Sequence, residues 1–114
     1  MKKPKDPMVF VGHIRDAILD IESHLRGVPE KNFYGDVKTQ DAVARKLMVI
    51  GEASKNVSLG FRKKHPHIDW EGQAGLRDVI VHDYFNLDLE VIWDIVIRLL
   101  PGLKTQVEKI LVER

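Results

Sequence analysis

Apolar side chains recur at three- and four-residue steps along the chain, which is the spacing of an α-helix rather than of a β-strand. The first series predicts a helix over residues 8–26 and comprises Phe10, Ile14, Ile18, Ile21 and Leu25. Gly27 followed by Pro29 is the usual signal for a helix end. Residues 1–7, MKKPKDP, are predicted to form a flexible basic tail before this helix.

A second series predicts a helix from Thr39, its expected N-cap, to about Leu59. Its apolar stripe consists of Val43, Leu47, Ile50 and Val57. Gly51 lies inside this helix, where glycine costs about 1 kcal/mol relative to alanine. We interpret it as a place where another helix approaches closely. Gly60 is predicted to end the helix, and residues 28–37 are predicted to form a linker before it.

Two further helices are predicted toward the C-terminus. Residues 60–70 are basic and contain a proline, which favours a turn-like segment. Asp69 is predicted to cap a short third helix, whose expected core positions are Leu76, Val79 and Ile80. Asp88 is predicted to cap a last helix that begins at Leu89 and is bent by Pro101.

This last helix is unusually apolar. Eight of the ten residues from Val91 to Leu100 are apolar, and only Asp94 and Arg98 form a polar stripe. Such a helix is either surrounded by the rest of its own chain or shared with a partner, because a surface helix has a wider polar face. We therefore predict an all-α fold, an antiparallel bundle of four to five helices that forms a homodimer, with residues 8–114 as a single helical domain.

Composition narrows the function classes. The chain has no cysteine, which excludes disulfides and thiolate metal sites and favours a reducing compartment. No apolar run approaches the roughly 18 residues of a membrane span, so no membrane association is predicted and a cytoplasmic location is expected. The net charge of +1 gives no overall attraction to nucleic acid. An RNA substrate would therefore need a local basic site, or one assembled from two chains.

Two of the five histidines, His65 and His67, flank a proline in the basic segment. Histidines two residues apart could contact one metal ion, but no third ligand follows at a suitable spacing. We therefore favour a solvated loop, and we predict neither a metal site nor a cofactor.

His82 differs because of the residues around it. Arg77, Asp78, His82, Asp83 and Tyr84 lie within eight positions. An imidazole can take a proton from a ribose 2′-hydroxyl, and a guanidinium can bind the phosphate on which charge accumulates. A phenol can hydrogen-bond that phosphate or stack on a base. Either neighbouring carboxylate could orient the imidazole.

The spacing of Arg77 and His82 restricts this interpretation. Five residues on an ideal helix turn the two side chains about 140° apart. The two groups meet at one phosphate only if the helix ends or distorts between them, or if a dimer completes the site. Without further information, a surface charge and a residue near a helix end are the commoner explanation.

The segment resembles the signature of HepT toxins, which belong to the HEPN superfamily. That signature is an Arg, a polar residue, three further positions, a His, any residue and a Tyr, and the matching residues here are Arg77, Asp78, His82 and Tyr84. Residues 46–58, Ile68 to Trp70 and the region after Leu89 also resemble the family, so the likeness spans residues 8–110. Asp78 departs from the family, where many members carry Asn, and its charge would partly neutralise Arg77.

The resemblance implies a function that the residues alone do not. Members form homodimers whose Arg and His motifs line a shared cleft, and they act as metal-independent endoribonucleases in type VII toxin–antitoxin systems. A minimal nucleotidyltransferase of the MntA kind neutralises them by transferring AMP to the motif tyrosine, here Tyr84. RNA, this antitoxin and a second copy of the chain are therefore the expected partners. The alternatives are a non-catalytic, nucleotide-binding partner subunit of a nucleotidyltransferase and a helical scaffold without a site.

Other charged residues are secondary candidates. Glu52 is expected to face the cleft and to position groups there, although a solvent-facing acid is the simpler explanation. Lys46 and Lys55 could contact phosphates, and the basic run 62–64 could steer RNA. Solvated surface positions are the commoner role for all of them.

Overall fold

The computed structural model describes residues 6–113, so most of the predicted tail lies outside the described residues. The first helix, α1 (Pro7–Leu25), begins one residue before its predicted start. The Asp6 carboxylate accepts a hydrogen bond from the backbone N–H of Met8 at 2.9 Å, which caps the helix. Pro7 is therefore helical rather than part of a tail, because proline fits the first turn of a helix.

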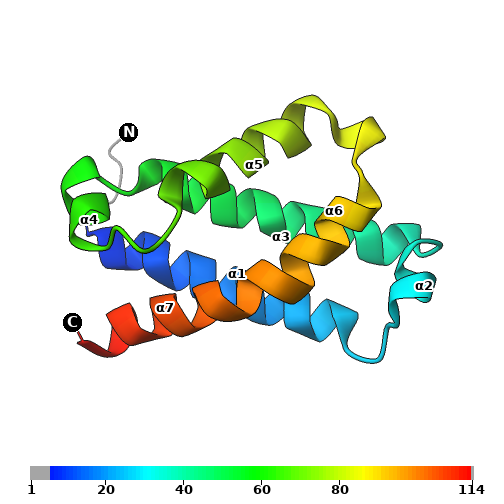
Figure 1. The fold of residues 1–114 in the computed structure, drawn as a ribbon, viewed down its shortest axis with the longest axis horizontal. Coiled ribbons are helices and arrows are strands. Elements are labelled where there is room, and N and C mark those ends of the chain that lie inside the picture. Colours follow the sequence, from blue (N-terminus) through cyan, green and yellow to red (C-terminus); the bar gives the residue numbers. More distant parts are fainter. Residues whose placement is uncertain (1–5, 114) are drawn as a thin grey trace.

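The described residues are helical and contain no strand, which confirms the all-α prediction. The long helices are α1, α3 (Val37–Asn56), α5 (Trp70–His82) and α7 (Leu100–Glu113). Along the chain they alternate in direction, and α3 packs between α1 and α5 while α7 packs on α1 (Figure 1). The shorter elements are α2 (Glu30–Phe33), α4 (Leu59–Lys64), η1 (Tyr84–Asn86), α6 (Leu89–Asp94) and η2 (Ile95–Leu99).

The core lies where the predicted stripes of α1 and α3 meet. Ile14, Ile18 and Ile21 of α1 are fully buried, as are Val43 and Leu47 of α3. Burial of an aliphatic side chain of this size stabilises the fold by about 1.5–3 kcal/mol each. The periodicity therefore located the main packing surface correctly. Among residues 6–113, no helix is both long and apolar enough to cross a bilayer.

The start of α3 differs from the prediction. Asp36, not Thr39, is the N-cap. Its carboxylate accepts hydrogen bonds from the Thr39 hydroxyl at 2.6 Å and from the Thr39 backbone N–H at 3.1 Å. These bonds lower the pKa of Asp36, because they favour its ionised form. The predicted linker before α3 also contains a short helix, α2.

The end of α3 was also predicted wrongly. The helix stops at Asn56, and Ser58 begins a new helix by accepting the Phe61 N–H at 3.2 Å. Gly60 therefore lies inside α4 instead of ending α3. The segment read as turn-like is partly helical because a serine N-cap stands directly before it.

Arg62, from the basic run, holds the end of α3. Its guanidinium donates hydrogen bonds to the carbonyls of Ser54 at 2.9 Å, Val57 at 3.1 Å and Lys55 at 3.3 Å. The last carbonyls of a helix lack partners within the helix, so a cation that binds them stabilises that end. Arg62 thus has a structural role that the sequence did not reveal.

We expect Arg62→Ala to lower the free energy of unfolding by about 1–2 kcal/mol, because it removes charged hydrogen bonds to backbone carbonyls. Urea denaturation followed by circular dichroism measures the change. Lys63→Ala is the matched control, since Lys63 is the exposed neighbour, and its effect should be within about 0.5 kcal/mol of zero. Equal midpoints for the two variants would contradict the capping role.

The last predicted helix is interrupted. Asp88 caps its start as predicted, accepting from the N–H groups of Glu90 at 3.1 Å and Val91 at 3.3 Å. A π-helical turn, η2, then separates α6 from α7 just before Pro101. Proline has no N–H and its ring crowds the preceding turn, so the wider π turn accommodates it.

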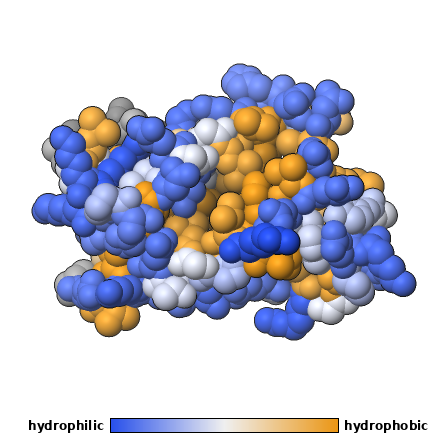
Figure 2. Space-filling model, viewed as in Figure 1, coloured by the Kyte–Doolittle hydropathy of each residue, from blue (hydrophilic) through white to orange (hydrophobic). Residues whose placement is uncertain are grey.

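The apolar face after α5 is only partly covered. Ile92, Val96 and Leu100 are buried, but Ile97 is 52% exposed and Leu99 is 63% exposed. The chain therefore does not surround this helix on all sides. Val79 of α5, predicted to be a core residue, is also exposed. Figure 2 shows apolar side chains gathered in a hollow between α5 and the α6–α7 region.

Candidate active site

Gly51 brings α3 and α5 into close contact. A Cβ atom at this position would lie 2.3 Å from the Arg77 Cβ and 2.6 Å from the Gln73 carbonyl oxygen. Only glycine allows this approach, so the prediction of close helix packing is confirmed. Nearby, the Gln73 side-chain amide donates to the buried Ser54 hydroxyl at 2.6 Å. These contacts fix the turn of α5 that carries Arg77.

We expect Gly51→Ala to lower the free energy of unfolding by about 1–3 kcal/mol, because the added methyl overlaps α5 backbone and Cβ atoms. Gly75→Ala is the matched control, since nothing lies within 4 Å of its Cβ position. That variant should gain up to about 1 kcal/mol from helix propensity. Thermal or urea denaturation compares the two. A stabilised Gly51→Ala protein would contradict the packing argument.

Arg77 lies in a group of four charged side chains. Its Nε is 3.0 Å from the Glu52 carboxylate, and its Nη1 donates to the Asp78 carboxylate at 3.0 Å. Lys55 contacts the same Asp78 oxygen at 3.3 Å. The hydrogen bonds from Arg77 and then Lys55 lower the pKa of Asp78. The structure thus brings Glu52, Lys55 and Asp78 to Arg77, while Lys46 pairs with Asp20 instead, at 2.9 Å.

This group orients Arg77 without using all of its donors. A guanidinium has five N–H donors, and the two contacts above involve Nε and Nη1. Nη2 has no hydrogen-bond partner within residues 6–113. The Arg77 side chain is 28% exposed. It can therefore present a free edge to an anion while two carboxylates hold the rest of the group.

His82 is the last residue of α5 and is exposed. Neither neighbouring carboxylate is bonded to it in the part of the chain that the structure describes. Asp78 is occupied by Arg77 and Lys55, and Asp83 accepts from the Asn86 amide at 3.4 Å. The structure does not bring His82 to the carboxylates that the sequence offered as orienting groups.

Arg77 and His82 do not converge within one chain. The helix runs without interruption from Trp70 through His82, so it neither ends nor distorts between the two residues. Regular geometry sets their side chains about 140° apart. Arg77 lies against α3, and His82 lies at the exposed end of α5. The local route, a helix that ends or distorts between Arg77 and His82, is therefore absent from α5.

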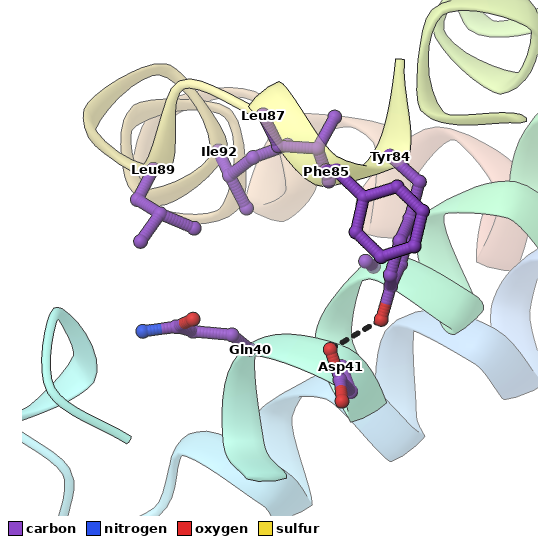
Figure 3. A pocket seen from close by; sticks show the side chains of 8 residues that line it. Gln40, Asp41, Tyr84, Phe85, Leu87, Leu89 and Ile92 are labelled. Atoms are coloured by element: carbon purple, nitrogen blue, oxygen red, sulfur yellow. Dashed lines mark hydrogen bonds between the residues drawn. The ribbon is translucent and has the colours of Figure 1, made fainter. Parts of the chain in front are cut away.

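Tyr84 is held by a residue that sequence reasoning missed. Its hydroxyl donates a short hydrogen bond to Asp41 of α3 (Figure 3). This bond is the main cause of the raised pKa of Tyr84, because the carboxylate stabilises the protonated phenol. The two residues are 43 positions apart, so no local pattern connects them. Tyr84 itself remains 39% exposed.

The basic-loop histidines show no metal-binding geometry in the described residues. The His65 ring lies 4.6 Å from the Phe61 ring and 6.1 Å from the His67 ring, measured between centroids. Within residues 6–113, no three His, Asp or Glu side chains are grouped as metal ligands. His65 instead packs against an aromatic side chain.

The helical bundle and the match to a HepT-like family model identify an all-α protein of the HEPN type. The family model described as "Ribonuclease HepT-like" matches residues 14–110, and the chain belongs to this family.

Curated relatives agree with this assignment. The chain is 42% identical over 101 residues to "Probable ribonuclease HepT" of Thermococcus cleftensis, covering 89% of this chain and 92% of that protein. It is 41% identical over 107 residues to "Putative RNase MJ0127" of Methanocaldococcus jannaschii, covering 94% and 88%. A longer protein of the same organism, "Gamma-glutamylcyclotransferase and putative RNase MJ0434", is 38% identical over 109 residues, covering 96% of this chain and 49% of its own length. No solved structure matches the chain significantly.

Proposed function

We propose that this chain is a metal-independent endoribonuclease whose active site forms in a cleft between two copies. Arg77 and His82 are its catalytic residues, and Tyr84 contacts the RNA in the same site. The observation that carries this proposal is that α5 is a regular helix, so that Arg77 and His82 lie on different sides of it. The chain also belongs to a family described as ribonuclease HepT-like. In a dimer, the Arg77 of one copy and the His82 of the other would meet in one active site.

An apolar groove supports the pairing of two copies. It has a volume of about 620 Å³ and lies beside α5, and polar residues that include His67, Gln73 and Arg98 share its lining. Its apolar lining residues are Leu47, Ile50, Leu76, Ile95, Leu99, Leu100 and Leu103. Exposed apolar patches of this kind mark protein–protein contacts more often than free surface. Leu76 is the residue before Arg77, so a partner seated in the groove would lie close to the motif.

The proposed reaction uses only side chains. The ribose 2′-oxygen attacks the adjacent phosphorus and its proton passes to the His82 imidazole. The free Nη2 edge of Arg77 binds the phosphate oxygens on which charge develops. The bond from phosphorus to the 5′-oxygen breaks, and that oxygen takes a proton from an acid in the cleft. The products are a 2′,3′-cyclic phosphate end and a 5′-hydroxyl end.

The test is RNA cleavage by the purified protein in EDTA. The expected products are fragments that carry 2′,3′-cyclic phosphate ends, which enzymatic end analysis identifies. A requirement for an added metal ion would overturn the metal-independent mechanism. Tight nucleotide binding with no RNA cleavage would favour the alternative of a non-catalytic partner subunit.

We further propose that the chain is the toxin of a toxin–antitoxin pair and that a minimal nucleotidyltransferase inactivates it at Tyr84. The Tyr84 oxygen would bond to the α-phosphorus of ATP as pyrophosphate leaves, and Asp41 would accept the phenolic proton. The added AMP would place a negative phosphate beside Asp41 and the proposed cleft. Repulsion and bulk would then oppose RNA entry.

Co-expression with a nucleotidyltransferase of this class is expected to raise the intact mass by one or more AMP units and to relieve growth arrest. Tyr84→Phe should show no increase in mass, because it lacks the accepting oxygen. Tyr34→Phe is the control, since Tyr34 pairs with Glu30 away from the motif. Inhibition with an unchanged mass would point to neutralisation by binding.

A further inference from the structure

Arg45 and Tyr84 line the same surface groove between α3 and α5. Its other lining residues are Asp41 and Met48 of α3 and Ile80 and Val81 of α5. The groove has a volume of about 450 Å³, and ligand pockets typically measure about 300–1,000 Å³. It therefore has room for one nucleotide of a longer strand.

The Arg45 guanidinium has no hydrogen-bond or ion-pair partner within residues 6–113, and the residue is exposed. Asp41 lies one turn before it on α3, at the spacing at which an aspartate and an arginine commonly pair. Asp41 instead accepts a hydrogen bond from the Tyr84 hydroxyl (Figure 3). Arg45 can therefore bind an anion in the groove without first breaking an ion pair.

Carboxylates compensate both cations that follow Arg45 on α3. Lys46 pairs with an aspartate of α1 at 2.9 Å. Lys55 belongs to the group around Arg77, whose two cations and two carboxylates cancel in formal charge. Binding of an RNA strand needs positive charge that its phosphates can neutralise. Arg45 provides such a charge in the groove that Tyr84 lines.

We propose that Arg45 binds a phosphate of the RNA strand next to the scissile phosphate, on the side of the cleft that carries His82. The inference rests on the proposed ribonuclease function and adds a substrate-binding residue to it. In that function Arg77 binds the scissile phosphate, whereas Arg45 shares its groove with Tyr84, two residues after His82. Arg45 therefore holds the strand in place and takes no part in bond breaking.

The other groove residues determine where this phosphate lies. The Asp41 carboxylate repels an anion, so the phosphate lies on the side of Arg45 that faces Met48, farther along α3. Met48 and Val81 offer an apolar surface there for the attached sugar or the face of its base. A phosphate contact positions the strand but carries no sequence information. Loss of Arg45 should therefore weaken binding equally for all sequences.

The first measurement is the KM and kcat of RNA cleavage in EDTA at several salt concentrations. Arg45→Ala should raise KM about tenfold and leave kcat within about twofold of the wild-type value, because the contact is the same before and during bond breaking. The slope of log KM against log salt concentration should fall by about 0.7, the value for one phosphate of a single strand. Arg45→Lys keeps the charge and should keep the slope.

Lys109→Ala is the matched control, because it also removes one positive charge. Lys109 is exposed near the end of α7, at the opposite end of the bundle from the segment that follows α5 (Figure 1). Its KM and salt slope should equal those of the wild-type protein. Both alanine variants should melt within about 3 °C of the wild-type protein, so a change in KM reports binding rather than stability.

A second readout changes the RNA instead of the protein. The main cut in an unmodified RNA is mapped first, and the linkages beside it are then made neutral one at a time as methylphosphonates. Each neutral linkage is compared with a charged one, with 2′-O-methyl ribose at that position in both RNAs. For the wild-type protein, one neutral linkage should raise KM about tenfold. For Arg45→Ala, the same linkage should have almost no effect.

The outcomes separate the two proposals. An Arg45→Ala protein with wild-type KM and salt slope would overturn the phosphate contact alone. Equal effects of every neutral linkage on the wild-type and Arg45→Ala proteins would overturn it as well. An unmodified RNA that stays intact with the wild-type protein would overturn the ribonuclease proposal itself.

Discussion

Replacing His82 by alanine is expected to reduce RNA cleavage about 10²–10⁴-fold without loss of the fold. In the proposed mechanism, the imidazole moves the proton on which the attack depends. His82 is exposed at the end of α5, and its imidazole forms no hydrogen bond or ion pair with the described residues. Its removal should therefore change the free energy of unfolding by less than about 0.5 kcal/mol.

Cleavage of a labelled RNA in EDTA, measured under single-turnover conditions, gives the rate for each variant. His24→Ala is the matched control, because this histidine is also exposed and lies in the last turn of α1, outside the motif. It should cleave at the wild-type rate. A His82→Ala protein that retained most of its activity would remove the imidazole from the mechanism.

The helices were predictable where burial repeats along the chain. The stripes of α1 and α3 reported their cores correctly, because each buried position recurs with the period of the helix. Val79 of α5 followed the same rule and is nevertheless exposed. Periodicity identifies an apolar face but does not say whether the same chain covers it. On α5, the bundle covers Ile80 and leaves Val79 at the surface.

Helix ends and long-range partners were less predictable. Thr39 is a residue type that often caps helices, but the carboxylate of the nearby Asp36 is a stronger acceptor. It accepts hydrogen bonds from both the backbone N–H and the hydroxyl of Thr39. The bond between Asp41 and Tyr84 depends on how the segment after α5 folds back over α3. Local sequence contains no signal for such contacts, because they arise only when the helices pack.

Arg77 and His82 show the same difference between local structure, which the sequence predicts, and long-range contacts, which it does not. The sequence placed Arg77 and His82 five residues apart and left open whether the helix continued between them. The structure answers the local question, because α5 is regular through both residues. It also shows that Gly51 and Glu52 hold Arg77 against α3. A site shared by two copies would bring the two groups together, and this proposal has a direct test.

That test pairs two inactive chains. A heterodimer of one Arg77→Ala chain and one His82→Ala chain should regain about half of the wild-type cleavage rate, although each homodimer is inactive. If every site takes its arginine from one copy and its histidine from the other, the heterodimer has one intact site and one doubly damaged site. Co-expression with two affinity tags isolates the heterodimer, and the cleavage assay in EDTA measures its rate.

The reciprocal pairing separates this arrangement from a site within one chain. A heterodimer of a wild-type chain with a chain carrying both substitutions should be inactive, because each shared site then lacks one of its two groups. A site contained in a single chain predicts the opposite pattern: half activity for this heterodimer and none for the first. Because α5 sets the two side chains about 140° apart, we expect activity to follow the shared pattern. Half activity in the reciprocal pairing would require one chain to bring Arg77 and His82 together by a rearrangement of α5.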